Sequence, residues 1–180
     1  MKRVNAVLSI VFCAALAIAT PISAKISVEA QIKEDLQTME TVLNNKSDVQ
    51  KLLTFFHTFI DESANFDISV QNPTLPENMQ ANSFSMNKEQ FINSFLQGTQ
   101  NIQNYSVSVN VEKVVQNQDK VTSAHTLIER GVVSNPMDPT ETGKAFISET
   151  KCLSNYDANA KTIAVKDSMC KTTVSFEEEI

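Results

Sequence analysis

The chain has 180 residues, of which 42% are hydrophobic and 20% charged, and its formal net charge at pH 7 is -6. This composition is typical of one globular domain and excludes the fibrous, low-complexity and disordered classes. The negative charge argues against nucleic acid as a partner, because phosphate binding needs clustered Lys and Arg.

The first 24 residues have the pattern of a secretory signal peptide. A basic start is followed by an apolar run from Val7 to Ala19 and by small residues ending at Ala24. The run is shorter than the roughly 20 residues that span a bilayer, and no later apolar cluster is longer. We expect cleavage after Ala24 and an exported, periplasmic or extracellular mature protein without a membrane span. Cleavage after Ala19 and an uncleaved anchor are the alternatives.

Apolar residues at steps of three and four predict two consecutive helices in the mature chain. The first covers residues 28–43 and the second covers Val49–Ile60. Ser47 and Gln50 have the spacing of a capping box at the start of the second helix. We expect Val49 to belong to the buried face of that helix.

The next segment predicts one short strand and a third helix. Residues 66–70 alternate between apolar and polar side chains, and two prolines then favour an extended loop. A third helix is expected to begin near Asn87 and to end or fray at Gly98.

From Tyr105 onward the hydrophobic period changes to two, which indicates a sheet. The pattern predicts two successive antiparallel hairpins, with strands over 105–115, 121–133, 144–153 and 162–176. A turn centred on Gln118 would place His125 opposite Val111 and Glu129 opposite Val107. We therefore predict an α+β fold in which N-terminal helices pack on a strongly curved antiparallel sheet.

The predicted organisation has four parts. They are a signal peptide (1–24), an N-terminal helical extension (25–46), a single α+β domain (47–176) and an acidic tail (177–180).

Two cysteines remain in the mature chain, Cys152 and Cys170. An even pair in an oxidising compartment predicts a disulfide, which would stabilise the fold by roughly 3 kcal/mol. Two buried free thiols or a metal pair are the alternatives. No further thiolate or imidazole lies near in sequence to complete a zinc site, so we predict no metal and no cofactor.

The order of elements resembles the nuclear transport factor 2-like superfamily, which includes ketosteroid isomerase-like and polyketide cyclase-like proteins. The segments that carry the resemblance are Val49–Ile60, Phe66–Val70, Asn87–Ile92 and Tyr105–Val115 leading into Val121. The resemblance implies a cone-like bent sheet wrapped around helices, with a pocket at the wide end. The superfamily also contains periplasmic scaffolds, including a membrane-anchored component of type IV secretion machines, so the fold alone does not choose a role.

The strongest candidate for acid-base chemistry is the pair His125 and Glu129. They share strand parity with Val121 and Leu127, so all four side chains are expected on one face. In a concave pocket, such a pair could exchange protons with a substrate. The alternative for His125 is a structural, hydrogen-bonded imidazole.

The candidate ligand-binding residues are Phe55, Phe59, His57 and Arg130. The phenylalanines form either a packed core or the lining of an apolar cavity. His57 stands four residues before Asp61, a helical spacing that allows either a dyad or an ordinary hydrogen bond. Arg130, the only arginine of the mature chain, could clamp a carboxylate or form a surface ion pair.

These observations predict an exported binding or interaction protein that works without turnover. Its partner would be a protein or a small apolar ligand, and a homodimer is compatible with the sequence. The first alternative is a small-molecule isomerase, cyclase or dehydratase that uses His125 and Glu129. The second is a membrane-anchored secretion-machine scaffold, if the signal is retained.

Overall fold

The computed structural model describes residues 27–73, 80–133, 143–157 and 163–176. The predicted signal peptide and the acidic tail lie outside the described residues, as do Asp138 and Glu141, which stand between the two predicted hairpins in the sequence. The elements in chain order are α1 (Val28–Asn44), α2 (Val49–Phe59), β1 (Ile60–Gln71), β2 (Ala81–Asn87), α3 (Lys88–Gln100), β3 (Ile102–Asn117), β4 (Lys120–Val133), β5 (Lys144–Asp157) and β6 (Val165–Phe176).

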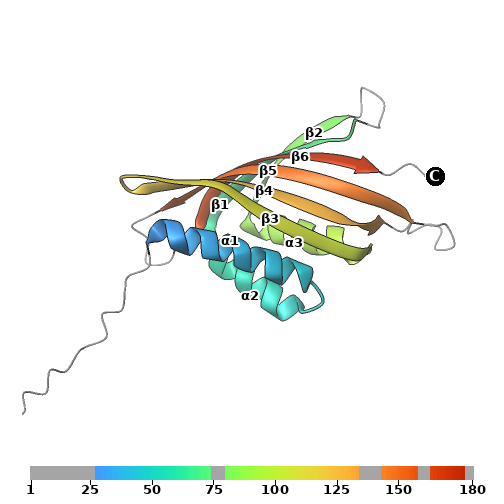
Figure 1. The fold of residues 1–180 in the computed structure, drawn as a ribbon, viewed down its shortest axis with the longest axis horizontal. Coiled ribbons are helices and arrows are strands. Elements are labelled where there is room, and N and C mark those ends of the chain that lie inside the picture. Colours follow the sequence, from blue (N-terminus) through green and yellow to red (C-terminus); the bar gives the residue numbers. More distant parts are fainter. Residues whose placement is uncertain (1–26, 74–79, 134–142, 158–162, 177–180) are drawn as a thin grey trace, which may run out of the picture.

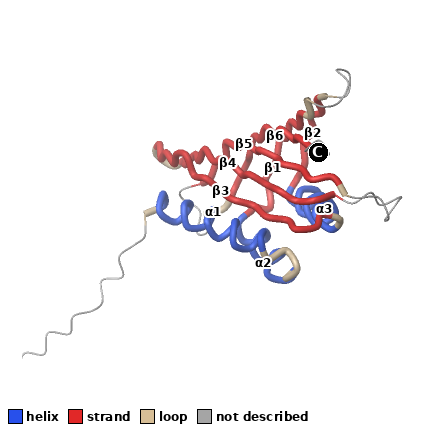
Figure 2. Tube along the Cα trace, turned by 45° about the vertical axis from the view of Figure 1, so that its right-hand side comes forward, coloured by secondary structure: helices blue, strands red, loops and turns tan. Residues whose placement is uncertain are grey.

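Six strands form one curved sheet in the order β2-β1-β6-β5-β4-β3. The three helices pack on one face of this sheet, as Figures 1 and 2 show. The two predicted hairpins, β3–β4 and β5–β6, are confirmed, and β4 also pairs with β5. The prediction of a wholly antiparallel sheet is wrong. The sheet is mixed, because β1 runs parallel to β6.

The first two helices differ from the prediction mainly at the ends of α2. The predicted capping box at Ser47 is wrong: Asp48 is the N-cap, and its side chain accepts a hydrogen bond from the Lys51 amide. Val49 is 45% exposed and does not belong to the buried face. The helix stops at Phe59, so Asp61 belongs to β1 and does not share a helix flank with His57.

The third helix begins where the sequence predicts and ends slightly later. Asn87 caps α3 by accepting a hydrogen bond from the Gln90 amide, and the Gln90 side chain accepts one from the Asn87 amide. The helix passes through Gly98 and ends at Gln100, so glycine does not stop it.

The predicted strand over residues 66–70 is part of a longer strand, β1, whose partner β2 was not predicted. Six of the seven β2 residues are exposed, and the strand lies at the sheet edge. An edge strand that buries few side chains needs no alternation of apolar and polar residues. The hydrophobic periodicity that identifies strands is therefore weak in β2.

The predicted pairing of β3 with β4 is confirmed, with Val107 opposite Glu129 and Val111 opposite His125. The turn itself is centred between Gln118 and Asp119, half a residue beyond the predicted centre, since Asn117 pairs with Lys120. A bulge between Val111 and Lys113 removes that offset and restores the predicted register.

Two side chains of α1 cover the free edge of β3. The Asn44 amide accepts a hydrogen bond from Val107 N at 2.9 Å and donates one to Val107 O at 2.8 Å. A Glu40 carboxylate oxygen accepts from Val109 N at 2.7 Å. The helix thereby satisfies backbone groups that an edge strand would otherwise present to another chain.

Replacing Asn44 by alanine is expected to reduce the free energy of unfolding by about 2 kcal/mol, because two hydrogen bonds are lost. Amide hydrogen exchange at Val107 should accelerate in the same variant. Gln37→Ala, on an exposed position of the same helix, is the control and should change neither quantity. An unchanged exchange rate at Val107 would show that α1 does not protect this edge.

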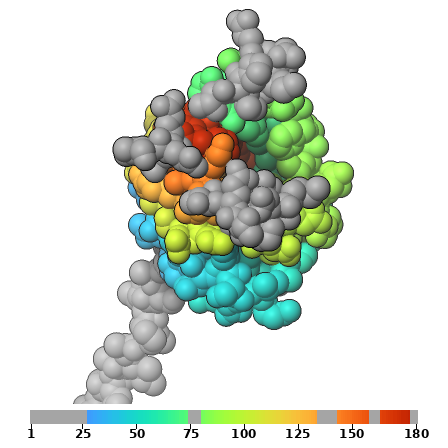
Figure 3. Space-filling model, turned by 90° about the vertical axis from the view of Figure 1, so that its right-hand side faces the viewer, coloured from blue at the N-terminus to red at the C-terminus, as the bar shows by residue number. Residues whose placement is uncertain are grey.

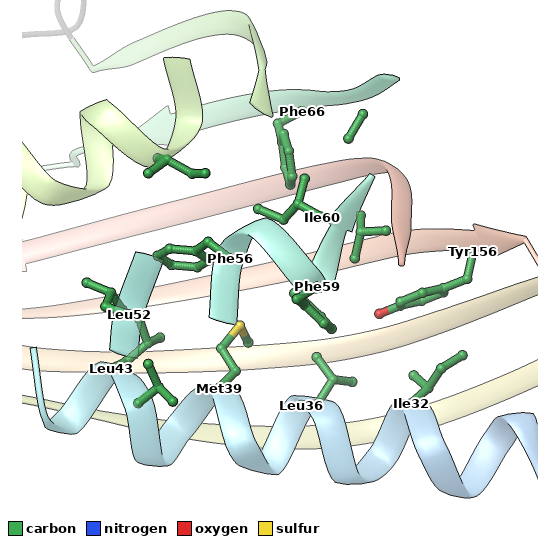
Figure 4. Close-up of a cluster of buried hydrophobic side chains, with 14 of the residues drawn as sticks. Ile32, Leu36, Met39, Leu43, Leu52, Phe56, Phe59, Ile60, Phe66 and Tyr156 are labelled. Atoms are coloured by element: carbon green, nitrogen blue, oxygen red, sulfur yellow. The ribbon is translucent and has the colours of Figure 1, made fainter. Parts of the chain in front are cut away.

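The hydrophobic core lies between α1, α2 and the sheet (Figure 4). Ile32, Leu36, Met39 and Leu43 point from α1 into this core. Ile32 and Leu36 have 0% exposure. The segment expected to be an N-terminal extension thus contributes to the same core as the rest of the domain.

A buried lysine joins the ends of two helices. Lys88, at the start of α3, is 2% exposed. Its ammonium donates to the His57 carbonyl oxygen at 3.0 Å and to a Glu62 carboxylate oxygen at 2.6 Å. This cation satisfies a carbonyl near the C-terminus of α2, as a basic group at a helix end is expected to do.

Candidate functional site

A cavity of about 190 Å³ lies between the helices and the sheet. Its helix wall is apolar and largely aromatic, and consists of Met39, Leu43, Phe56, Phe59, Phe91 and Phe95. In the space-filling view of the right-hand end of the molecule (Figure 3), the orange and red surfaces of β5 and β6 lie between the yellow of β3 and β4 and the green of α3. An apolar cavity of about 150 Å³ accommodates benzene, so this one has room for a small organic molecule.

The sheet wall of the cavity carries most of its polar groups. It consists of Ile60, Phe66, Ile68, His125, Leu127, Glu129, Thr150, Cys152, Ser154, Val165, Ser168, Cys170 and Thr172. Alternation along the strands turns these side chains toward the helices. The cavity is therefore two-sided, with aromatic rings facing hydroxyl, imidazole and carboxylate groups.

The centre of the sheet wall is a ladder of three cross-strand pairs between β5 and β6. The predicted disulfide, Cys152–Cys170, is confirmed and forms the middle rung. Thr150 and Thr172 share a hydrogen bond of 2.9 Å between their hydroxyl oxygens, and Ser154 and Ser168 share one of 2.8 Å. The Thr150–Thr172 pair uses one hydrogen internally, so its second hydroxyl can donate to a ligand. The Ser168 hydroxyl also lies 3.4 Å from Cys170 Sγ, a disulfide sulfur that can only accept a hydrogen bond.

His125 is held on the sheet wall by a buried hydroxyl network. Its Nδ1 lies 3.2 Å from the Ser123 hydroxyl, which lies 3.1 Å from the Tyr156 hydroxyl. With Nδ1 engaged, Nε2 is the ring nitrogen available to a ligand. Burial lowers the pKa of His125 to about 4, and the Glu112 carboxylate opposes that shift. The imidazole is therefore neutral at physiological pH.

Glu129 is oriented by a tyrosine that the sequence did not single out. The Tyr105 hydroxyl donates to a Glu129 carboxylate oxygen at 2.6 Å. Burial, and then the Glu129 charge, raise the pKa of Tyr105 far above its usual value, so the phenol remains a donor. The Lys46 ammonium lies 4.9 Å from the centre of the Tyr105 ring, a cation–π contact.

The structure places His125 and Glu129 on the same wall of the cavity without bringing them into contact. Leu127 lies between them, and four residues of strand separate their Cα atoms by about 13 Å. Each is bonded to a different partner, Ser123 or Tyr105. They could contact opposite ends of one ligand, but they do not form a hydrogen-bonded pair.

The other candidate ligand-binding residues divide into those inside and those outside the cavity. Phe59 lines it. Phe55 stacks on Phe59 with ring centres 5.1 Å apart and lines a separate surface groove between α1 and α2. His57 and Arg130 are exposed and do not line this cavity, so the structure does not bring them together with His125 and Glu129. A ligand-binding role for either residue stays a prediction.

The predicted relation between His57 and Asp61 is also replaced by other contacts. An Asp61 carboxylate oxygen accepts hydrogen bonds from the amide and the hydroxyl of Ser63, and the other lies 3.6 Å from the Lys166 ammonium. These bonds lower the pKa of Asp61, the Ser63 hydroxyl having the largest effect.

The described ranges of the chain contain neither a cluster of metal-binding side chains nor a membrane-spanning helix. No group of three or more His, Cys, Asp or Glu side chains in them could hold a metal ion. None of the helices described is both long and apolar enough to cross a membrane.

Solved structures with the same arrangement of helices and strands share little sequence with this chain. A hexachlorocyclohexane dehydrochlorinase, LinA type 2, has 10% identity and a TM-score of 0.57 over 84% of this chain and 90% of its own. A putative scytalone dehydratase from Novosphingobium aromaticivorans has 9% identity and a TM-score of 0.56 over 85% and 90%. A conserved protein from Planctomyces limnophilus has 12% identity and a TM-score of 0.56 over 83% and 97%.

This chain has the nuclear transport factor 2-like fold. The predicted resemblance is therefore confirmed at the level of the nuclear transport factor 2-like architecture, in which helices fill a bent sheet. No protein-family model matches the sequence, and no curated protein matches it. The roles of individual residues in this chain therefore rest on its own geometry.

Proposed function

We propose that the protein binds a small molecule with an aromatic or alicyclic body and one polar edge. The observation that carries the proposal is the two-sided cavity, with Phe56, Phe59 and Phe95 on its helix wall. Burial of apolar surface against these rings would supply affinity, and His125 and Glu129 would orient the polar edge.

Binding without turnover fits the state of His125 better than proton transfer does. A general base works best with a pKa near the working pH, and burial lowers the pKa of His125 to about 4. The neutral ring can instead donate or accept one hydrogen bond at Nε2. Glu129 and His125 act, on this proposal, as separate recognition groups.

Export is the second part of the proposal. It is supported by the basic start and apolar run within residues 1–24 and by the Cys152–Cys170 disulfide, which is typical of oxidising compartments. Mass spectrometry of protein recovered from its native cells tests it. A mature chain starting at Lys25 supports export, whereas a chain that retains residues 1–24 favours the membrane-anchored alternative.

Occlusion of the cavity tests ligand binding, with 2-naphthol as the probe and naphthalene as its apolar partner. Thr172 lines the cavity, and Thr173 is the next residue on the opposite face of β6. Thr172→Trp is expected to weaken 2-naphthol binding by more than about tenfold, because the indole occupies the ligand volume. Thr173→Trp should leave the affinity unchanged. Isothermal titration calorimetry measures both.

The polar wall predicts that 2-naphthol binds about two- to tenfold more tightly than naphthalene, the value of one hydrogen bond. Circular dichroism checks that each variant is folded. Failure of 2-naphthol to bind the folded wild-type protein, or equal binding by the two Trp variants, would contradict the proposed site.

A catalytic role is the second candidate, and the observation that favours it is the orientation of Glu129 by Tyr105. A carboxylate fixed beside an apolar cavity can remove a proton from carbon, the step that starts an elimination or isomerisation. Two structures with the same fold are named a dehydrochlorinase and a dehydratase, names that denote eliminations. Product analysis on small cyclic halides and alcohols tests this role. Turnover that is lost in Glu129→Gln would replace the binding proposal with a catalytic one.

A further inference from the structure

The Cys152–Cys170 disulfide is part of the cavity surface. Both cysteines line the cavity. In the strand register they belong to one row that crosses the concave face, with His125 beside Cys152 and Ile68 beside Cys170. A ligand that fills the cavity would therefore contact the sulfur atoms directly.

The pairing of β5 with β6 does not depend on the disulfide. The two strands pair on both sides of it, from Phe146 opposite Phe176 to Asn155 opposite Asp167. The hydroxyl pairs next to it, Thr150–Thr172 and Ser154–Ser168, add side-chain hydrogen bonds. The strands should remain in register after reduction.

Reduction changes the cavity wall because two thiols need more space than one disulfide. Two non-bonded sulfur atoms cannot remain at bonding distance, and the strand pairing holds their Cβ atoms in place. The cysteine side chains point to the concave face, so the separating thiols move toward the cavity or toward their row neighbours, His125 and Ile68. In either case the volume and polarity of the sheet wall change.

We propose that ligand binding in the cavity is coupled to the oxidation state of Cys152 and Cys170, the oxidised form binding more tightly. The inference rests on the proposed ligand-binding function. Coupling between binding and reduction is reciprocal, so a bound ligand must also protect the disulfide from reduction. The site would thus retain its ligand in an oxidising compartment and release it to a dithiol reductant.

The reductant in the proposed step is a dithiol, represented in the experiment by dithiothreitol. Its two thiols lose their hydrogens and close to a cyclic disulfide, while Cys152 and Cys170 each gain one hydrogen. One S–S bond breaks in the protein and one forms in the reagent, so two electrons and two protons are transferred.

The first measurement compares 2-naphthol binding before and after reduction, with near-ultraviolet circular dichroism to confirm that the reduced protein is folded. The affinity for 2-naphthol is expected to fall about fivefold or more on reduction. A fivefold change is at the lower end of the affinity changes that coupled sites typically show. The double variant Cys152→Ala/Cys170→Ala is the control, and dithiothreitol should not alter its affinity. Equal binding by the folded oxidised and reduced proteins would overturn the proposal.

The second measurement is made at equilibrium, because the reciprocity of coupling applies to equilibria and not to rates. The protein is held in mixtures of oxidised and reduced dithiothreitol, and the oxidised fraction is read by rapid alkylation and mass spectrometry, with and without saturating 2-naphthol. The ligand is expected to shift the equilibrium constant of the wild type about fivefold or more toward the disulfide and to have no effect on Thr172→Trp, whose cavity is filled. An unchanged wild-type equilibrium constant would overturn the coupling while leaving ligand binding intact. Failure of 2-naphthol to bind the oxidised protein would instead refute the proposed function, and the coupling with it.

Discussion

Replacing Leu36 by alanine is expected to reduce the free energy of unfolding by about 3 kcal/mol. Leu36 has 0% exposure, and its side chain packs between α1 and the aromatic residues of α2. Truncation removes buried methyl groups and leaves a cavity that the surrounding side chains fill only in part. Urea denaturation followed by circular dichroism measures the change.

The matched control is Gln37→Ala, at the next position of the same helix and on its exposed face. It should change stability by less than about 0.5 kcal/mol. If Leu36→Ala also reduced the free energy of unfolding by less than about 0.5 kcal/mol, α1 would be a separate extension, as the predicted boundary at residue 46 implies. A large loss would show that one cooperative domain starts at α1.

The elements that could be predicted from sequence are those whose pattern is local. The period of two after Tyr105 is sufficient for both hairpins, because alternation fixes which side chains share a face. Asn87 followed by Gln90 marks the start of α3 through contacts within one turn. Cys152 and Cys170 could be paired because the third cysteine, Cys13, lies in the predicted signal peptide.

The elements that could not be predicted depend on contacts distant in sequence. β2 is an exposed edge strand, and its pairing with β1 leaves little mark in its composition. The parallel pairing of β1 with β6 joins residues about a hundred positions apart in the chain. Neither contact is encoded in a short window of sequence.

The candidate site shows the same division. Strand parity placed His125, Leu127 and Glu129 on one face, and all three line the cavity. Their hydrogen-bond partners were not predictable, because Tyr105 reaches Glu129 and Tyr156 reaches Ser123 from other strands. Nor could a run of phenylalanines on α2 show which rings face a cavity.

Acidification is expected to destabilise the protein through His125. Burial lowers the pKa of this residue in the folded state to about 4, whereas an imidazole in an unfolded chain has a pKa of about 6.5. Between these values the unfolded chain binds the proton more readily, so the free energy of unfolding rises with pH. The stabilisation is complete above about pH 6.5 and is lost as the pH falls toward 4, by about 3 kcal/mol.

His125→Gln isolates this effect, because the amide can keep the bond to Ser123 but does not titrate. Urea denaturation of both proteins from pH 4 to pH 8 gives the difference in stability, from which the contributions that both proteins share cancel. The difference is expected to shift in favour of the variant by about 3 kcal/mol between pH 7 and pH 4. Parallel profiles would mean that the folded protein accommodates a charged His125. The imidazole would then be available for proton transfer, and the case for binding without turnover would weaken in favour of catalysis.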